Sequence, residues 1–191
     1  MIMKKLIEAM KNCEQMPGLS VLEHGEMVVN YYNDLLNHIR NKDELKYDWK
    51  LPEWIYDKII LDNLDDDELM NRYQLYHDCG KPFCIEYDDE GKKHFPNHAQ
   101  VSYEKWLEFN PEDKKVAKYI LMDMDIHLLK ADGANEFSKR DEAKGLLLTG
   151  LAELHANASM FGGIESTSFK IKWKSLNKSG KRLINIWKGE A

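Results

Sequence analysis

The residues best suited to chemistry are an adjacent pair, His77 and Asp78, and His24, which lies far from them in the sequence. Neighbouring residues of a helix point about 100° apart, but near a helix end both side chains can reach one ion from different sides. Imidazole nitrogen and carboxylate oxygen suit first-row divalent metals, and a mixed set with open coordination positions suits a hydrolytic centre. An isolated His-Asp pair is weak evidence, because such pairs also arise by chance, so its context decides.

Two predicted helices would position these residues. Residues 20–40 have apolar side chains near helical spacing, with His24 close to the start of the apolar face and Ser20 as a capping residue. Residues 69–79 are predicted to form a helix whose last turn carries His77 and Asp78, since a glycine and a proline that terminate helices follow directly.

The remaining chain predicts an all-α fold with a small insertion. Further helices are expected over residues 2–13, 53–61, 98–109, 112–129 and 139–161. A short polar hairpin is expected from residues 84–87 and 93–95 around an acidic turn. The alternation of Phe169, Ile171 and Trp173 predicts that the tail from Ser166 is a strand or an appended arm. We therefore expect a compact helical domain over residues 1–165 and a basic C-terminal arm, residues 166–191, packed on it or extending from it.

Composition places the chain among soluble globular proteins. Its 191 residues suit one domain, and 43% hydrophobic with 31% charged residues is ordinary for a folded protein. No run of about 18 uncharged apolar residues exists, and the N-terminus lacks the apolar region of a signal peptide. The three cysteines, Cys13, Cys79 and Cys84, fit a reducing compartment. We expect a cytoplasmic protein without membrane contact, and the sequence indicates no oligomeric state.

Charge is unevenly distributed along the chain. The net charge of −6 argues against a protein coated in nucleic acid. From Ile164 to Ala191, however, seven basic residues face two acidic ones, so this segment carries +5 and the remainder −11. RNA contact through the basic arm is therefore one expectation, although clustered lysines are often only solvated and phosphate contacts carry no sequence specificity.

The context of the His-Asp pair adds a family resemblance. It is carried by three segments in order, namely Leu22-Glu23-His24-Gly25, Tyr76-His77-Asp78-Cys79-Gly80-Lys81-Pro82 and His94-Phe95-Pro96-Asn97-His98. They resemble the HD phosphohydrolase superfamily, and most of all the HD domain attached to bacterial CCA-adding tRNA nucleotidyltransferases, where HDxGKP precedes an acidic turn, HFxxH and a helix. The resemblance covers roughly residues 19–160, and the ordered motifs are more specific than any one of them. The nucleotidyltransferase catalytic head itself is absent.

The resemblance implies an HD-type helical bundle with one divalent metal ion held by an H…HD…D set. In this sequence the first three ligands would be His24, His77 and Asp78. The segment Leu151–Ala158 resembles the family's closing stretch, with His155 where the family has aspartate. A His-His-Asp-His site would carry one negative charge less and favour softer ions among Mn, Ni, Co, Fe, Zn and Mg. Alternatively, the site is degenerate.

Further residues are candidates for catalysis and substrate binding. His98 and His127 would contact phosphate or the leaving group, with Asp78 as the central carboxylate, although either histidine can instead be a packing residue. Lys81 could neutralise a substrate phosphate, or it is a solvated lysine near a helix end. One of Asp123 and Asp125 could orient His127, but two exposed carboxylates are the expectation.

The chemistry implied is attack of a metal-bound water on a phosphoester. The resemblance implies a nucleotide or RNA-end substrate, such as a 2′,3′-cyclic phosphodiester or a phosphomonoester. A 5′-nucleotidase or (d)NTP triphosphohydrolase is the alternative within this chemistry, and a degenerate, non-catalytic RNA-binding module is the alternative from another class. Cys79 is not expected to be a nucleophile, and no GxGxxG, Walker-type or GxSxG motif supports other chemistries.

Overall fold

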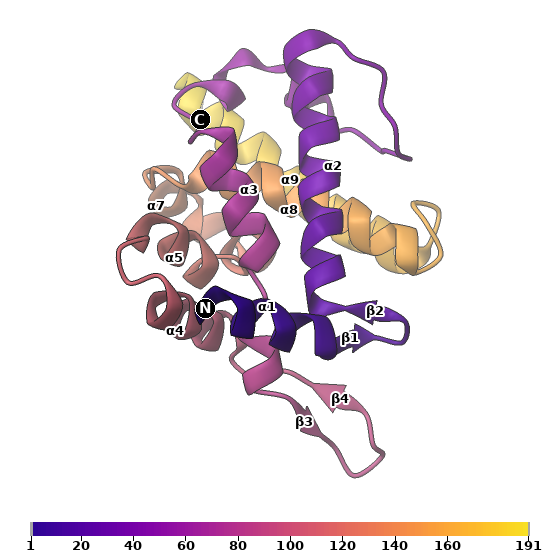
Figure 1. Cartoon of the computed structure of the whole chain (residues 1–191). Helices are drawn as coiled ribbons and strands as arrows, with labels where there is room; N and C mark the ends of the chain where they lie inside the picture. Colours follow the sequence, from indigo (N-terminus) through magenta and orange to yellow (C-terminus); the bar gives the residue numbers. More distant parts are fainter. Residues whose placement is uncertain (1, 191) are drawn as a thin grey trace. The chain divides into compact units, whose positions relative to one another are not determined.

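The computed structural model describes residues 2–190 and confirms the predicted all-α fold with a small hairpin (Figure 1). Met1 and Ala191, the outer ends of the two predicted regions, lie outside the described residues. The chain divides into two compact units: the first contains the chain up to Val29 and Asp67–Met124, and the second contains Asn30–Asp66 and the chain from Asp125 onward. Each unit is therefore built from two separate segments, and the boundary expected at residue 165 falls inside the second unit. Among the described residues, no helix is long and apolar enough to cross a membrane.

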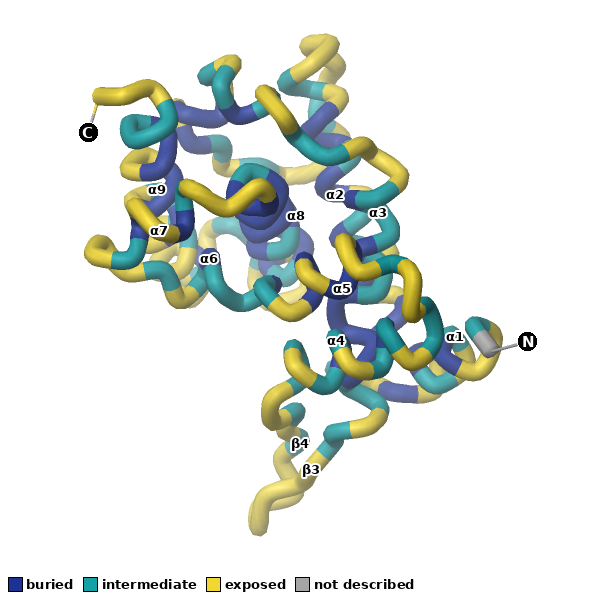
Figure 2. Tube along the Cα trace, turned by 90° about the vertical axis from the view of Figure 1, so that its left-hand side faces the viewer, coloured by how far each residue is buried: buried dark blue, intermediate teal, exposed yellow. Residues whose placement is uncertain are grey.

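The first unit combines helices with two very short antiparallel sheets. Its elements are α1 (Ile2–Asn12), β1 (Glu14–Met16), β2 (Leu19–Ser20), the first part of α2 (Val21–Asn41), α3 (Asp67–Tyr76), the 3-10 helix η3 (Lys81–Phe83), β3 (Glu86–Tyr87), β4 (Lys93–His94), α4 (His98–Phe109) and α5 (Lys114–Leu121). The β1–β2 ribbon turns at Gly18, whose φ of +78° suits glycine. The predicted hairpin is confirmed as β3–β4, which projects away from α1 and α4 and is largely exposed (Figures 1 and 2).

Three buried aromatic side chains form part of the core of the first unit. Helix α5 packs against α3 and α4, and the rings of Tyr73 and Tyr119 stack with centroids 4.9 Å apart. Trp106 of α4 is buried, and its indole N–H donates to the carbonyl oxygen of Asp113. The Asp113 carboxylate accepts from the backbone N–H of Val116 to cap α5 and from Arg72 of α3 at 2.8 Å. These contacts hold α3 firmly, and α3 carries the residues that lead into the predicted metal site.

The second unit is built around one buried helix. Its elements are the remainder of α2, the 3-10 helices η1 (Glu53–Tyr56), η2 (Lys58–Leu61) and η4 (Ala131–Gly133), and the helices α6 (Asp125–Leu128), α7 (Ala134–Ser138), α8 (Ala143–Met160) and α9 (Thr167–Lys188). Helix α8 is apolar over most of its circumference, and Figure 2 shows it dark blue along much of its length. Such a helix is stable only when neighbours cover it on several sides, and α6 and α9 pack against it.

The tail from Ser166 is the main secondary-structure correction. It forms the long helix α9, so the predicted strand or irregular arm is wrong. Ser166 caps the helix by accepting from the backbone N–H of Phe169 at 3.2 Å, and Gly189 ends it with a φ of +72°. Phe169, Leu176 and Leu183 are buried at a spacing of seven residues, which is a helical pattern. The alternation that suggested a strand covered too few residues to compete with it.

Two further predicted helices are interrupted, and a third is shorter than predicted. Residues 53–61 form two 3-10 turns in place of one helix, and the predicted helix 112–129 divides into α5 and α6. The predicted helix 139–161 begins only at Ala143, as α8. Met122, Asp123 and Met124 separate α5 from α6, so Asp123 is at a helix break.

Candidate metal centre

His77 and Asp78 follow the last residue of α3, Tyr76, and lie in a turn. The sequence predicted them inside the last turn of a helix over residues 69–79, so α3 ends three residues earlier than predicted. Their side chains are 1% and 2% exposed. Gly80 lets this turn approach α4, because a Cβ atom there would lie 2.3 Å from the backbone nitrogen of Ser102. The backbone N–H of Gly80 instead donates to Ser102 Oγ at 2.8 Å. The glycine of the motif therefore seats the His-Asp turn against a neighbouring helix.

His24 reaches the same region from the first turn of α2. Ser20 and Glu23 form a reciprocal capping box at the start of that helix, with distances of 2.7 and 3.2 Å. A Cβ atom on Gly25 would lie 2.2 Å from the carbonyl oxygen of Leu75, so glycine allows close contact between α2 and α3. The His24 and His77 rings consequently lie with centroids 5.2 Å apart.

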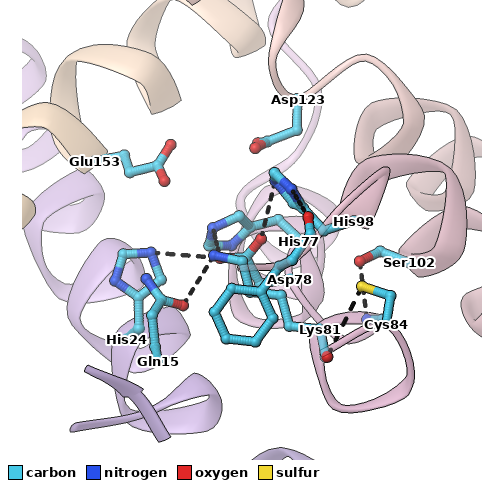
Figure 3. Close-up of polar contacts among 12 residues, drawn as sticks. Gln15, His24, His77, Asp78, Lys81, Cys84, His98, Ser102, Asp123 and Glu153 are labelled. Carbon is cyan, nitrogen blue, oxygen red and sulfur yellow. Dashed lines mark hydrogen bonds and ion pairs between the residues drawn. The ribbon is translucent and has the colours of Figure 1, made fainter. Parts of the chain in front are cut away.

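The side chains of His24 and His77 both approach one carboxylate oxygen of Asp78 (Figure 3). Asp78 Oδ2 lies 3.2 Å from His77 Nε2 and 3.7 Å from His24 Nε2. One ring nitrogen of His24 lies within 4.8 Å of one ring nitrogen of His77. The structure thus brings together three of the four predicted ligands within the first unit.

The hydrogen bond on the far side of the His77 ring orients that ligand. His77 Nδ1 lies 2.7 Å from the carbonyl oxygen of Gln74, and a carbonyl oxygen only accepts, so Nδ1 carries the proton. Nε2 then directs its lone pair toward Asp78 in the neutral ring. A nitrogen lone pair that faces a carboxylate oxygen is stabilised when a proton or a cation lies between the two atoms. A histidine that binds a metal through one nitrogen commonly donates the N–H of the other to a backbone carbonyl or a carboxylate.

Lys81 and Gln15 complete the surroundings of Asp78. Lys81 Nζ donates to Asp78 Oδ2 at 2.7 Å and to Gln15 Oε1 at 3.1 Å, and its side chain is 12% exposed. Burial alone would raise the pKa of Asp78, but the nearby His77, Lys81 and His24 together hold it well below its ordinary value. Lys81 is therefore not the solvated lysine of the alternative interpretation. It is a cation directed at the carboxylate of the site.

His98 faces Asp78 from the start of α4. The preceding Asn97 adopts a left-handed conformation with a φ of +53°, and His98 Nδ1 lies 3.3 Å from the carbonyl oxygen of Phe95. Its Nε2 lies 3.7 Å from Asp78 Oδ1, and its side chain is 24% exposed. His98 is more accessible than His24 or His77, which suits a group that contacts substrate.

Two polar residues of this region were not predicted. Asp123, expected to be exposed, is 4% exposed and accepts a hydrogen bond from the hydroxyl of Tyr73. Figure 3 draws it near His77 and His98. Gln15 comes from β1, a strand that the sequence analysis did not anticipate. The apolar residues on both sides of Asp123 were the available signal of its burial, whereas nothing in the sequence indicated Gln15.

His155, the fourth predicted ligand, belongs to the second unit and has a different environment. Its Nδ1 lies 2.8 Å from the carbonyl oxygen of Leu151, and its Nε2 accepts from the backbone N–H of Lys50 at 3.0 Å. The rings of Trp49 and Phe169 lie 4.5 and 5.0 Å from it. Because both ring nitrogens are engaged, His155 has no lone pair left for a metal, and we leave it out of the ligand set.

His127 also belongs to the second unit. Its Nε2 lies 3.5 Å from Glu153 Oε2, with side chains 27% and 14% exposed. Asp125 pairs with Arg140, and the orienting role predicted for one of the two aspartates stays a prediction. The substrate role of His127 stays a prediction.

Cys79 is excluded as a nucleophile by its surroundings. The thiol is buried, and this burial raises its pKa far above the ordinary value. Its Sγ lies 3.4 Å from the carbonyl oxygen of Ser102, to which it donates. The side chain is therefore a protonated packing group of the His-Asp turn.

The donor set fits a divalent metal. Two imidazole nitrogens and one carboxylate suit first-row ions, and three protein ligands leave positions for water and substrate. Comparisons of the chain with protein-family models, curated proteins and solved structures find no match. The family resemblance therefore stays a prediction.

Proposed function

We propose that this chain is a metal-dependent phosphohydrolase whose divalent ion is held by His24, His77 and Asp78. The observation that supports the proposal is the convergence of two buried imidazoles on one buried carboxylate oxygen, at 3.2 and 3.7 Å. Charged and polar groups are costly to bury unless they are paired or bind a cation. A centre of this composition, with open coordination positions, is typical of hydrolytic metal sites.

The remaining residues of the first unit would bind and orient a phosphoester. A bound divalent ion lowers the pKa of water and withdraws charge from phosphoryl oxygens. Lys81 provides an ammonium group that can turn from Asp78 to a phosphate oxygen and balance the charge that develops there. His98 donates Nδ1–H to a backbone carbonyl, so its Nε2 can hold a proton for the leaving oxygen.

The proposed substrate class is a nucleotide or RNA-end phosphoester. Within it we place a 2′,3′-cyclic phosphodiester or a phosphomonoester first, and 5′-nucleotides or (d)NTPs second. This ranking comes from the motif resemblance, so the experiment must include all of these substrates.

The test measures metal content and turnover with the full chain. Native protein, Asp78→Asn and the control Asp89→Asn are loaded with Mn, Ni, Co, Fe, Zn or Mg and assayed on 2′,3′-cyclic nucleotides, nucleoside monophosphates and dNTPs. Asp89 is exposed on the hairpin of the same unit, so it matches the chemical change without touching the site. We expect about one tightly bound ion per chain and turnover in the native and Asp89→Asn proteins. Asp78→Asn should lose both.

Two outcomes would contradict the proposal. If native protein binds none of these ions and hydrolyses none of these substrates, the His-Asp cluster is a structural polar network. If Asp78→Asn retains native turnover, the hydrolytic centre lies elsewhere in the chain.

A further inference from the structure

Helix α9 carries a one-sided array of basic side chains that the proposed metal centre does not use. Between Thr167 and Lys188 the sequence contains seven basic residues and no acidic one. Each of five exposed members lies three or four residues from another member, so together they occupy one side of the helix. We call this set the basic face: Lys170, Lys174, Lys178, Lys181 and Arg182. The buried Phe169, Leu176 and Leu183 occupy the other side.

Most of the positive charge on this face is not neutralised. Lys170 pairs with Glu165 at 3.0 Å, but across residues 2–190 the other four members of the basic face form no ion pair. Residues 174–182 extend about 12 Å along the helix axis, which is enough for a few consecutive phosphates. A local excess of about four positive charges on a protein of net charge −6 attracts polyanions in preference to other ligands.

A groove of about 830 Å³ borders the basic face at Lys181. It is lined by aromatic rings and side-chain amides of the same unit, with Trp54, Tyr56, Trp173, Asn177 and Asn185 among them. The lining contains two basic residues, Lys181 and Lys188, and two acidic ones, Glu53 and Asp57, of which Lys188 and Asp57 pair at 3.0 Å. The groove is therefore close to neutral, and it offers ring surfaces and amides where the basic face offers charge.

The rings of the groove are held in fixed positions. A Cβ atom on Gly180 would lie 2.4 Å from the Trp54 ring, so glycine lets α9 lie directly on that indole. Trp54 Nε1 donates to Asn177 Oδ1 at 2.9 Å, and Trp173 Nε1 donates to the carbonyl oxygen of Lys50 at 2.7 Å. Tyr56 is 61% exposed, and its hydroxyl lies 3.1 Å from His38 Nε2, with the His38 ring edge-on to the tyrosine ring. Fixed rings lose little conformational freedom when a planar ligand binds.

We propose that the basic face of α9 and the adjoining groove bind single-stranded nucleic acid. The backbone phosphates lie along the basic face, and a base contacts Tyr56 and Trp173. Aromatic side chains can stack only on bases that are not enclosed in a duplex, so the combination of rings and lysines favours a single strand. RNA and DNA strands share this chemistry. The site lies in the second unit and does not depend on the proposed hydrolytic activity.

The test is a binding titration of the full chain with labelled oligonucleotides in EDTA, which prevents metal-dependent turnover. The probes are oligouridylate and oligothymidylate of about 12 nucleotides, a length within the usual range for one single-strand site, and a duplex of equal length. We expect both single strands to bind more tightly than the duplex. Tighter binding of only one single strand would assign the sugar preference, and equal or tighter binding of the duplex would overturn the proposal.

The decisive variant removes charge from the basic face. In Lys174→Ala/Lys178→Ala/Lys181→Ala we expect at least tenfold weaker binding and a shallower salt dependence, by about 2 in the log–log slope for three lost single-strand contacts. The matched control is Lys4→Ala/Lys5→Ala/Lys11→Ala, which removes the same charge from exposed positions of α1. It should bind within about twofold of the native protein. Equal losses in the two triple variants would show a general charge effect and overturn the proposal.

The groove is tested separately through its rings. Tyr56→Ala and Trp173→Ala should each weaken single-strand binding about tenfold, whereas Trp173→Phe should retain most of it, since stacking needs a ring. Circular dichroism checks the fold of each variant, and Tyr56→Ala decides if Trp173→Ala is misfolded, because the Tyr56 ring is exposed. Native affinity in a folded Tyr56→Ala variant would overturn the role of the groove.

Discussion

His77 in the first unit and His155 in the second are equally buried, at 1% exposure each, but their neighbours differ. His77 donates its Nδ1–H to the backbone carbonyl oxygen of Gln74 and directs Nε2 at the carboxylate of Asp78. His155 has a backbone partner at each nitrogen and aromatic rings on its faces. Burial therefore does not distinguish a proposed metal ligand from a structural histidine. The two histidines differ in the group that faces Nε2, which is a carboxylate at His77 and a backbone N–H at His155.

The two environments also differ in electrostatics. Around Asp78, positive and ligating groups converge on one carboxylate and lower its pKa. Around His155, burial lowers the imidazole pKa to about 4, although the hydrogen bonds to Leu151 and Lys50 oppose this shift. The first environment favours a charged cluster, and the second favours a neutral ring. The second arrangement holds Lys50 against α8 and so fixes the loop that leads to η1.

The largest expected effect comes from exchanging the two histidines in turn for glutamine. His77→Gln should weaken divalent-metal affinity at least about 100-fold, because a ligand is lost, as compared with 10–100-fold when only a supporting hydrogen bond is lost. His155→Gln should keep metal affinity within about twofold. Isothermal titration with the ion that the native protein binds measures both. Equal losses in the two variants would return His155 to the ligand set and remove the contrast between the environments.

The next effect is a pH dependence that belongs to His155. The folded chain keeps this ring neutral down to a pKa of about 4, whereas the unfolded chain has the ordinary value of 6.5. Between these values the unfolded state binds the extra proton, so the free energy of unfolding falls as pH falls, by roughly 3 kcal/mol at the lower limit. The stabilisation is fully present above pH 6.5. Urea denaturation of native protein and His155→Gln in EDTA should show this slope only in the native protein.

A third comparison uses two glycines, one in each unit. In Gly80→Ala the new Cβ would meet backbone atoms of Val101 and Ser102, and in Gly180→Ala it would meet the Trp54 ring. Each should destabilise the protein by about 2 kcal/mol, because overpacking forces the neighbours to shift. Only Gly80→Ala should also weaken metal binding, since it displaces the His77-Asp78 turn. Unchanged metal affinity in a folded Gly80→Ala protein would show that the turn tolerates displacement.

The sequence predicted the helices of the first unit that carry the proposed metal centre. Apolar periodicity and Ser20 located the start of α2, and Gly80 indicated the end of α3 to within a few residues, since that helix ends at Tyr76. The structure places His24, His77 and Asp78 close together. Local signals sufficed there because caps and terminators act within a few residues. They could not locate Gln15 or the burial of Asp123, since these depend on packing between segments distant in the chain.

The second unit was predicted less well for a physical reason. His155 occupies a motif position, but its role is decided by Lys50, which is 105 residues away in the sequence. The tail was predicted from three alternating residues, whereas the apolar repeat that forms α9 extends over Phe169, Leu176 and Leu183. Because the tail is a helix, most of its basic residues lie on one face, and a count of basic residues in the sequence could not establish this. Motif resemblance thus selected candidate residues, and only tertiary contacts separated the proposed ligands from His155, which packs between other side chains.

The smallest expected effect contrasts the two N-capping serines. Ser20 caps α2 four residues before His24, and Ser166 caps α9, each accepting a backbone N–H at 3.2 Å. Ser20→Ala and Ser166→Ala should both lower the free energy of unfolding in EDTA by about 1 kcal/mol, because each leaves one N–H of its helix without a capping acceptor. Only Ser20→Ala loosens the turn that holds His24, a proposed metal ligand, so it alone should weaken metal affinity, by a few-fold. A similar loss of metal affinity in both variants would mean that general stability, and not the position of His24, limits metal binding.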